Sequence, residues 1–170
     1  MIENNDIIDI LVAEWKQERP ELDVEAMQVI GRIIKLGKIL EKSASHALLD
    51  SGIHYTDLDV LATIRRSGKP YALPPKQLMK SVLITSGAMT ALLDRLTKLE
   101  LIYRAPDIKD GRIKLAGLTK KGMKIIDEAI KIRFSEAKST VKVFNKTEHA
   151  TLSKLLKKLL LSLESEDKIS

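Results

Sequence analysis

The stretch LITSGAMTALLDRLTKLELIYRAPDIKDGRIKLAGLTKKG, residues 83–122, has apolar residues at helical spacing in its first half and short, strand-like apolar runs in its second half. Its second half has two short apolar runs, 101–105 and 113–117, on either side of a polar turn that contains Asp110 and Gly111. The stretch therefore predicts an amphipathic helix over 85–99 followed by a two-stranded ribbon. The helical part repeats its apolar side chains at helical spacing in one stripe: Met89, Leu92, Leu93, Leu96 and Leu99.

Two shorter helices are predicted on the N-terminal side of this stretch. Thr56 and Asp59 have the spacing of a capping box, which opens a helix that ends near Gly68. The connector 69–73 can hold one short strand, and the proline pair 74–75 then opens another helix. The order helix, short helix, amphipathic helix and ribbon is that of a winged helix-turn-helix.

Longer helices are predicted at both ends of the chain. The first covers 5–18, and a second covers most of 23–52. After the ribbon a third begins at Thr119, and Asn145, three residues before Glu148, caps the last one. The predicted fold is therefore mainly α with a small β-wing.

This fold divides the chain into three predicted parts. Residues 53–122 form the winged helix-turn-helix DNA-binding domain. Residues 1–52 form N-terminal helices that we expect to mediate dimerisation and to roof a ligand pocket. Residues 123–170 form C-terminal helices that we also expect to mediate dimerisation.

The net charge of +6 is unevenly distributed along the chain. Between Arg65 and Lys124 there are 14 basic residues against four acidic ones, whereas the remainder has 15 basic and 19 acidic residues. If the protein binds a polyanion, we therefore expect the segment between Arg65 and Lys124 to form the binding surface. Charge alone fits a solvated basic surface equally well.

Several classes of protein are disfavoured by composition. The chain has no cysteine, its three histidines are scattered, and it has no phosphate-cradling glycine loop and no cluster with metal-ligand spacing. We therefore expect no enzyme activity, no cofactor and no metal. The longest apolar runs, such as 159–161, are far too short to span a membrane, and the N-terminus lacks the order of a signal peptide. A cytoplasmic protein is the simplest interpretation.

The helix predicted over 85–99 has a face suited to the major groove of DNA. A recognition helix presents its N-terminal residues to base edges. Hydroxyl side chains there can donate or accept hydrogen bonds, and glycine and alanine let the backbone come close. An ordinary surface helix with small residues at its start is the alternative. The candidate DNA contacts on this helix are Thr85, Ser86, Gly87, Thr90, Ala91 and, further along, Arg95.

The turn 107–112 is predicted to be the tip of the wing. Arg112 would reach the minor groove, and Asp110 can hold its guanidinium in a bidentate pair. A solvated ion pair of little energetic value is the alternative. Other lysines fit contacts to backbone phosphates, which position a protein without reading sequence: Lys109, Lys114, Lys120, Lys121 and Lys124.

These motifs resemble those of a known family. LITSGAMT at 83–90 and LDRL at 93–96 are similar to the recognition helix of MarR-type regulators, and 107–112 followed by LTKKG at 118–122 is similar to their wing and helix entry. The resemblance covers most of the chain. It implies a triangular homodimer with interleaved N- and C-terminal helices, which places its recognition helices about 34 Å apart in successive major grooves of a pseudo-palindromic operator. It also implies a regulator, usually a repressor, that releases double-stranded DNA when a small aromatic anion binds.

The N-terminal portion resembles the PecS-like urate-responsive branch of this family, through EW at 14–15, ERPELD at 18–23, VIGR at 29–32 and DLDVLATIRRSG at 57–68. The resemblance implies an effector site formed by Trp15, Asp59 and Arg104. The branch has a further arginine on the recognition helix, where this chain has Leu92. Because leucine offers a purine anion no cationic donor, a weakened urate site and a site for another aromatic, such as a phenolic compound, are both open.

Each of these three residues also has a structural interpretation. Trp15 can anchor the first helix, Asp59 can be the acid of the capping box, and Arg104 can contact phosphate. Two other functions also stay open beside operator recognition. One is architectural DNA binding without sequence preference, and the other is a winged helix that binds proteins.

Overall fold

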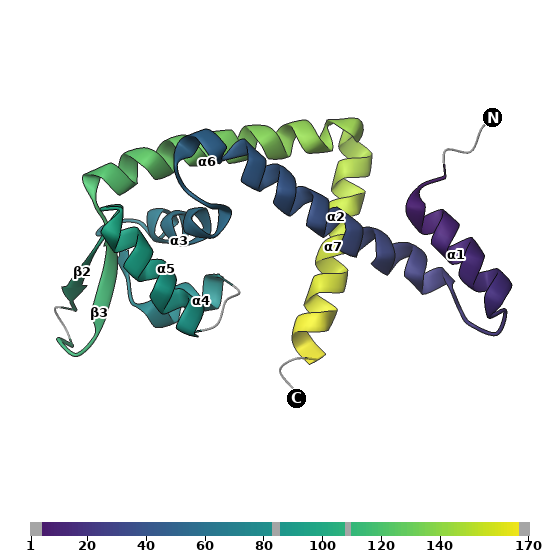
Figure 1. Ribbon diagram of the computed structural model, residues 1–170, viewed down its shortest axis with the longest axis horizontal. Helices are drawn as coiled ribbons and strands as arrows, with labels where there is room; N and C mark the ends of the chain where they lie inside the picture. The colour runs from purple at the N-terminus through teal and green to yellow at the C-terminus, as the bar shows by residue number, and fades with distance from the viewer. Residues whose placement is uncertain (1–4, 83–85, 108–109, 167–170) are drawn as a thin grey trace.

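The computed structural model describes residues 5–82, 86–107 and 110–166 of the chain. It is mainly helical, with one small sheet, and extends from a winged end to a helical end (Figure 1). The elements follow the predicted order: α1 (Ile7–Glu18), α2 (Glu25–Ala47), η1 (Leu49–Ser51), α3 (Tyr55–Arg66), β1 (Ala72–Leu73), α4 (Pro75–Ser81), α5 (Ser86–Lys98), β2 (Ile102–Pro106), β3 (Lys114–Leu118), α6 (Lys120–Thr140), η2 (Val141–Val143) and α7 (Lys146–Glu166).

The predicted ribbon is confirmed and gains a third strand. β2 and β3 pair antiparallel, and β1 pairs with the other edge of β3, so that the strand order is β1-β3-β2. The short strand expected in the connector 69–73 is therefore this edge strand. Tyr103 lies opposite Gly117 in the ladder, and its ring occupies the space that a side chain at position 117 would need.

The main hydrophobic core lies inside the winged domain. The apolar stripe of α5 is buried through Met89, Leu93 and Leu96, which pack with buried side chains of α3 such as Leu61. α6 closes the core from the other side through Ile126. The burial of this stripe leaves the opposite face of α5 on the surface.

The start of α3 differs from the prediction. The helix begins at Tyr55, two residues earlier than the Thr56–Asp59 pair suggested, and His54 is its N-cap residue. Asp57 is then the third residue of the helix, and its carboxylate accepts a hydrogen bond from the His54 backbone N–H at 2.8 Å. The expectation that Asp59 closes the capping box is wrong, because Asp59 lies a further half-turn along the helix.

The entry into α6 depends on a close approach of two backbones. Thr119 caps this helix, since its Oγ1 accepts a hydrogen bond from the Gly122 N–H at 2.9 Å. A Cβ atom at Gly122 would lie 1.9 Å from the carbonyl oxygen of Leu101. Glycine therefore lets α6 start directly against the beginning of β2.

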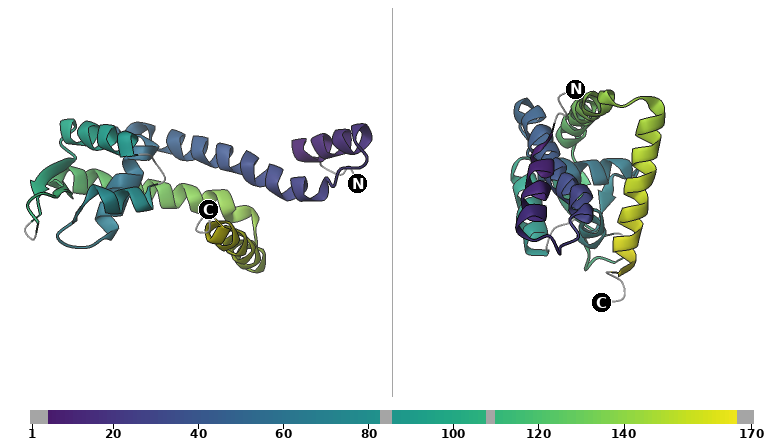
Figure 2. Two further views of the ribbon diagram at one scale, coloured as in Figure 1. Left: turned by 90° about the horizontal axis from the view of Figure 1, so that it is seen from below. Right: turned by 90° about the vertical axis from the view of Figure 1, so that its right-hand side faces the viewer.

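The outer helices carry many apolar side chains that one copy of the chain does not cover. α2 leads away from the winged domain and holds α1 at its far end, while α6 leads to α7 (Figures 1 and 2). None of the described side chains of α7 is buried. In the part of the chain that the structure describes, no helix is long and apolar enough to cross a membrane.

Candidate nucleic-acid interface

The N-terminal half of α5 presents a small, polar surface to solvent. Ser86, Gly87, Thr90 and Ala91 are all exposed, opposite the buried stripe of the same helix. The Thr90 hydroxyl donates to the Ser86 carbonyl oxygen at 3.1 Å. Thr85, also predicted to contact DNA, lies outside the described residues. This surface is shallow enough for a close approach of base edges.

The C-terminal end of α5 is held by the start of α6. Lys121 donates from Nζ to the Leu99 carbonyl oxygen at 2.9 Å, and Thr119 donates from its hydroxyl to the Glu100 carbonyl oxygen at 2.6 Å. Both acceptors belong to the helix end, whose carbonyls lack partners within the helix. Lys121, also a candidate phosphate contact, thus has its ammonium group at the C-terminal end of α5. Lys120 and Lys124 stay exposed.

Arg95 is engaged by an acid on α3. Its guanidinium lies against the carboxylate of Asp57, with Nη2 at 3.1 Å from Oδ2. The Asp57 side chain is 0% exposed, and the Arg95 side chain is 41% exposed. The ion pair therefore gives Arg95 a structural partner in addition to its predicted contact with DNA.

The wing tip shows the predicted Asp110–Arg112 pair. Arg112 donates from Nε to Oδ1 at 3.0 Å and from Nη2 to Oδ2 at 3.1 Å. The hydrogen bonds from Arg112 lower the pKa of Asp110, and the Arg112 side chain remains 91% exposed. A bidentate pair restricts the direction of a side chain that is otherwise free to reach a groove. Lys109 lies outside the described residues, and Lys114 is exposed on β3.

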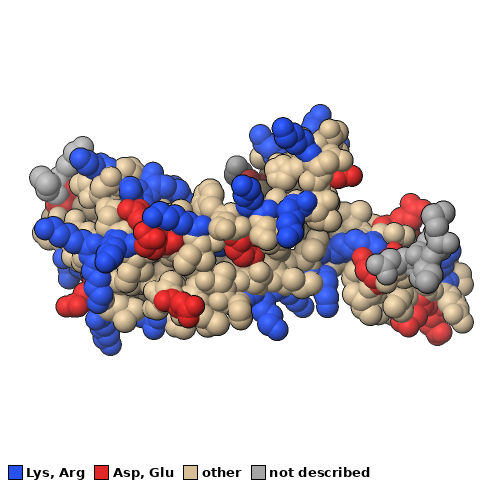
Figure 3. All heavy atoms as spheres, turned by 90° about the horizontal axis from the view of Figure 1, so that it is seen from above, with Lys and Arg blue, Asp and Glu red and all other residues tan. Residues whose placement is uncertain are grey.

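Cationic side chains continue from the wing over the neighbouring surface. In Figure 3, Lys and Arg side chains are spread over the winged end, and acidic side chains gather around α1. This distribution agrees with the charge of the segment between Arg65 and Lys124. The winged end therefore presents a cationic surface of the kind that attracts a polyanion.

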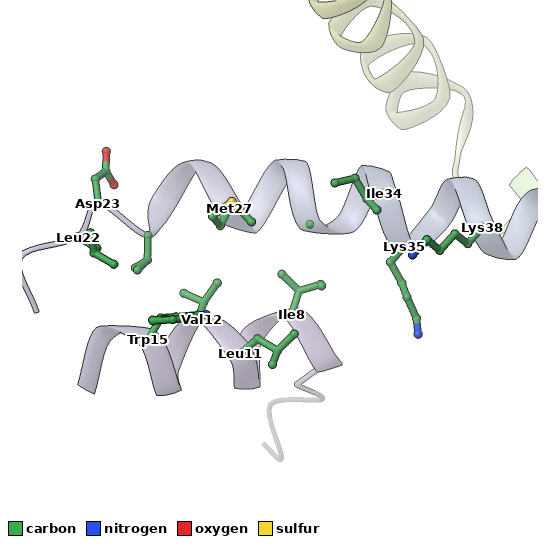
Figure 4. A pocket seen from close by; sticks show the side chains of 12 residues that line it. Ile8, Leu11, Val12, Trp15, Leu22, Asp23, Met27, Ile34, Lys35 and Lys38 are labelled. Carbon is green, nitrogen blue, oxygen red and sulfur yellow. The ribbon is translucent and has the colours of Figure 1, made fainter. Parts of the chain in front are cut away.

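Trp15 lines an apolar groove between α1 and α2. The groove has a volume of about 580 Å³, and the Trp15 side chain is 54% exposed. Figure 4 shows Leu22 and Asp23 at one end of the groove and Lys35 and Lys38 at the other. Its apolar walls are formed by Ile8, Leu11 and Val12 on α1 and by Met27, Gly31 and Ile34 on α2.

The other two predicted effector residues lie in the winged half of the molecule. Asp59 is half-buried on α3, and this burial raises the pKa of its carboxyl, against the opposing charges of Arg66 and Arg133. Arg104 is exposed on β2. One copy of the chain thus separates Trp15 from both, since α1 lies at the far end of α2 from α3 and β2 (Figures 1 and 2).

Leu92 is partly buried and packs against the core of the winged domain. A leucine is suited to this place, where an arginine would have to bring its charge out to solvent or find a partner. The described residues contain no group of His, Asp or Glu side chains that could hold a metal ion.

Two contacts at this surface were missed by sequence reasoning. Asp57 was not recognised as the acid that caps α3 and holds Arg95, although it stands three residues after His54, which is the spacing of a capping box. The helix-capping role of Lys121 had no signal in the sequence, because it depends on how α6 meets α5.

Comparison with known proteins points to one family. The model of the MarR family matches residues 51–113. The HTH-type transcriptional regulator PecS of Dickeya dadantii (strain 3937) is 30% identical over 146 residues, which cover 86% of this chain and 88% of PecS. A mutant of MarR from E. coli, complexed with operator DNA, is 26% identical with a TM-score of 0.69, and the match covers 86% of this chain and 97% of that one.

A further neighbour shares the fold at lower identity. BpsR of Bordetella bronchiseptica, whose DNA binding is regulated by 6-hydroxynicotinic acid, is 21% identical with a TM-score of 0.67. The match covers 76% of this chain and 91% of BpsR.

Proposed function

This chain belongs to the MarR family of DNA-binding transcription regulators, and from that premise we propose that it recognises a specific operator as a homodimer and responds to a small aromatic anion. The observation that carries the proposal is the exposed N-terminal face of α5 beside a wing whose Arg112 is held by Asp110. The exposed face of α5 can contact base edges in the major groove, and the oriented Arg112 side chain can enter the minor groove.

The DNA contacts divide by role. Ser86, Gly87, Thr90 and Ala91, with Thr85, meet base edges, and Arg112 enters the minor groove. Lys109 and Lys114 bind backbone phosphates and set the position of the domain on the duplex.

The proposed dimer is supported by the apolar faces of the outer helices. Met27 and Ile34 of α2 face the groove beside Trp15, whereas Val29 and Leu36 are exposed on the opposite side of the helix. An exposed apolar face of this kind is typical of an interaction surface. α7 exposes a leucine stripe. A second copy of the chain would cover these faces and hold two recognition helices at the spacing of successive major grooves, about 34 Å. The stripe on α7 comprises Leu152, Leu155, Leu156 and Leu163.

The proposed effector is urate, a phenolic compound or a related aromatic anion, and its binding releases the operator from a repressor. The groove beside Trp15 has a size typical of small-molecule sites, which span about 300–1,000 Å³. Since one copy separates Trp15 from Asp59 and Arg104, a site made of all three requires the second copy. Release then follows if the effector binds more tightly to a dimer whose helices no longer match the operator.

The test uses labelled duplex from the region upstream of the protein's own gene. We expect binding at least roughly a thousandfold tighter than to random duplex, with a steep decrease as salt rises. Equal affinity for both duplexes would indicate architectural DNA binding, and no affinity for either would indicate a protein-binding module.

The effector is tested by adding urate or a phenol to the complex, with an unrelated anion as control. Trp15 is the only tryptophan of the chain, so a change in its emission reports on the groove itself. Trp15→Phe should retain operator binding and lose part of the response. Release that is unchanged in Trp15, Asp59 and Arg104 variants would refute this effector site.

A further inference from the structure

The ion pair between α5 and α3 has a geometry that restrains the recognition helix. The buried carboxylate of Asp57 accepts from the His54 backbone N–H at 2.8 Å and from Arg95. Arg95 donates from Nε to both carboxylate oxygens at 3.3 Å and from Nη2 to Oδ2 at 3.1 Å. Because a buried carboxylate is stable only with hydrogen bonds and a charged partner, both side chains are kept in place.

Arg95 stands on the flank of α5. Thr90 and Asp94 lie on the exposed face and Met89 and Leu93 on the buried face. Since successive residues turn by about 100° around a helix, Arg95 follows Asp94 toward the side that faces α3. Its hydrogen bonds to Asp57 agree with this placement. Its position is therefore better suited to fixing the helix than to meeting base edges.

The other contacts of α5 that the structure describes restrain its rotation less specifically than the ion pair does. The apolar stripe packs through dispersion and burial, which have little directional preference. Lys121 restrains the C-terminal end of the helix by its hydrogen bond to the Leu99 carbonyl oxygen at 2.9 Å, but a bond at the end of the axis does little against rotation about it. The bond between Arg95 and Asp57 is directional and lies off the axis.

We propose that Arg95 is a positioning residue, which through Asp57 fixes the rotation of α5 about its own axis and so determines which side chains meet the base edges. A rotation of about 20° moves a side chain on a helix of roughly 10–12 Å diameter by about 2 Å. Hydrogen bonds to bases do not survive such a displacement. The inference rests on the proposed function, because it requires α5 to read an operator.

The experiment compares operator and random duplex for wild type, Asp57→Asn, Arg95→Gln and the double variant. Asp57→Asn removes a negative charge, so simple electrostatics would strengthen binding to any DNA. We expect the opposite for the operator alone: affinity falls about tenfold or more, the size of coupling found between contacting residues, and affinity for random duplex stays within about twofold. The double variant, in which two amides replace two charges, should recover part of the loss.

Lys98→Gln is the matched control, because it removes a cation from the exposed part of α5 without touching Asp57. Removing this exposed charge should change the affinity for operator and for random duplex by the same factor, because a general electrostatic effect does not depend on sequence. Arg95→Lys keeps the charge but cannot form the same fork of hydrogen bonds, and should therefore lose operator preference like Arg95→Gln. If circular dichroism shows that Asp57→Asn is unfolded, the operator preference of Arg95→Lys tests the inference in its place.

Unchanged or stronger operator binding by a folded Asp57→Asn variant would overturn the inference. So would an Arg95→Gln variant whose affinity for operator and for random duplex falls by the same factor, as in Lys98→Gln. A wild type without operator preference would instead refute the proposed function.

Discussion

Gly122→Ala tests the packing of α6 against the wing. The added methyl carbon would lie 1.9 Å from the Leu101 carbonyl oxygen, and ordinary contact begins near 3.4 Å, so one backbone must move by roughly 1.5 Å. This movement breaks two hydrogen bonds. One runs from the Thr119 N–H to the Leu101 carbonyl oxygen at 3.1 Å, and the other from Lys121 Nζ to the Leu99 carbonyl oxygen at the end of α5. Overpacking costs about 1–3 kcal/mol. Each lost hydrogen bond adds about 1 kcal/mol.

We therefore expect Gly122→Ala to lower the free energy of unfolding by about 3–5 kcal/mol. For a chain of this size the melting temperature should fall by about 6 °C or more. The melting temperature is measured by monitoring thermal unfolding with circular dichroism. Both proteins are compared at one concentration, because the proposed dimer makes the midpoint concentration-dependent.

Gly87→Ala is the control for this measurement. A Cβ atom at Gly87 meets nothing within 4 Å, and alanine is the better helix former, so stability should be unchanged or slightly higher. A Gly122→Ala variant that melts within a degree or two of the wild type would refute the reasoning, because it would mean that the two backbones separate without cost.

Three further predictions concern the wing, the half-buried acid Asp59 and the dimer. Arg112→Ala should weaken operator binding and lower the slope of log affinity against log salt concentration by about one, as measured by fluorescence anisotropy. An unchanged slope would show that Arg112 does not contact the DNA. Asp59→Asn should raise stability at neutral pH, because burial raises the pKa of Asp59 above its ordinary 3.8 and the folded protein holds an unfavourable charge once the pH exceeds that raised pKa. The gain should shrink as pH falls toward 3.8, and equal melting temperatures at pH 7 would contradict it. Leu156→Glu should shift sedimentation toward monomers and weaken operator binding, whereas an unaltered dimer would show that the α7 stripe is not the interface.

Much of the winged domain could be predicted from the sequence. The stripe at 89–99 and the two runs around 107–112 are periodic over short distances, and the helix and ribbon that they predict are both present. Asn145 caps α7 as expected, because a cap bonds to backbone only two or three residues away. The first turn of α3 was misplaced for a similar reason: Thr56–Asp59 and His54–Asp57 have the same spacing, and only the structure shows which pair forms the box.

The proposed sites divide in the same way. The Asp110–Arg112 pair was predictable because its partners are two residues apart in a tight turn. The partner of Arg95 is 38 positions away, so no local pattern indicates it. The distance of Trp15 from Asp59 and Arg104 likewise depends on the direction in which α2 leaves the winged domain, which a resemblance between sequences does not express.

The order of the helices and strands, the buried face of α5 and the pair at the wing tip thus follow from local sequence, because they depend on dihedral preferences and on hydrogen bonds between near neighbours. Three other features become visible only in the folded chain: Asp57 holds Arg95, Lys121 caps α5, and the outer helices expose apolar faces that one copy does not cover. These features arise where distant segments pack, and a charged or apolar side chain acquires its partner from whichever segment lies beside it.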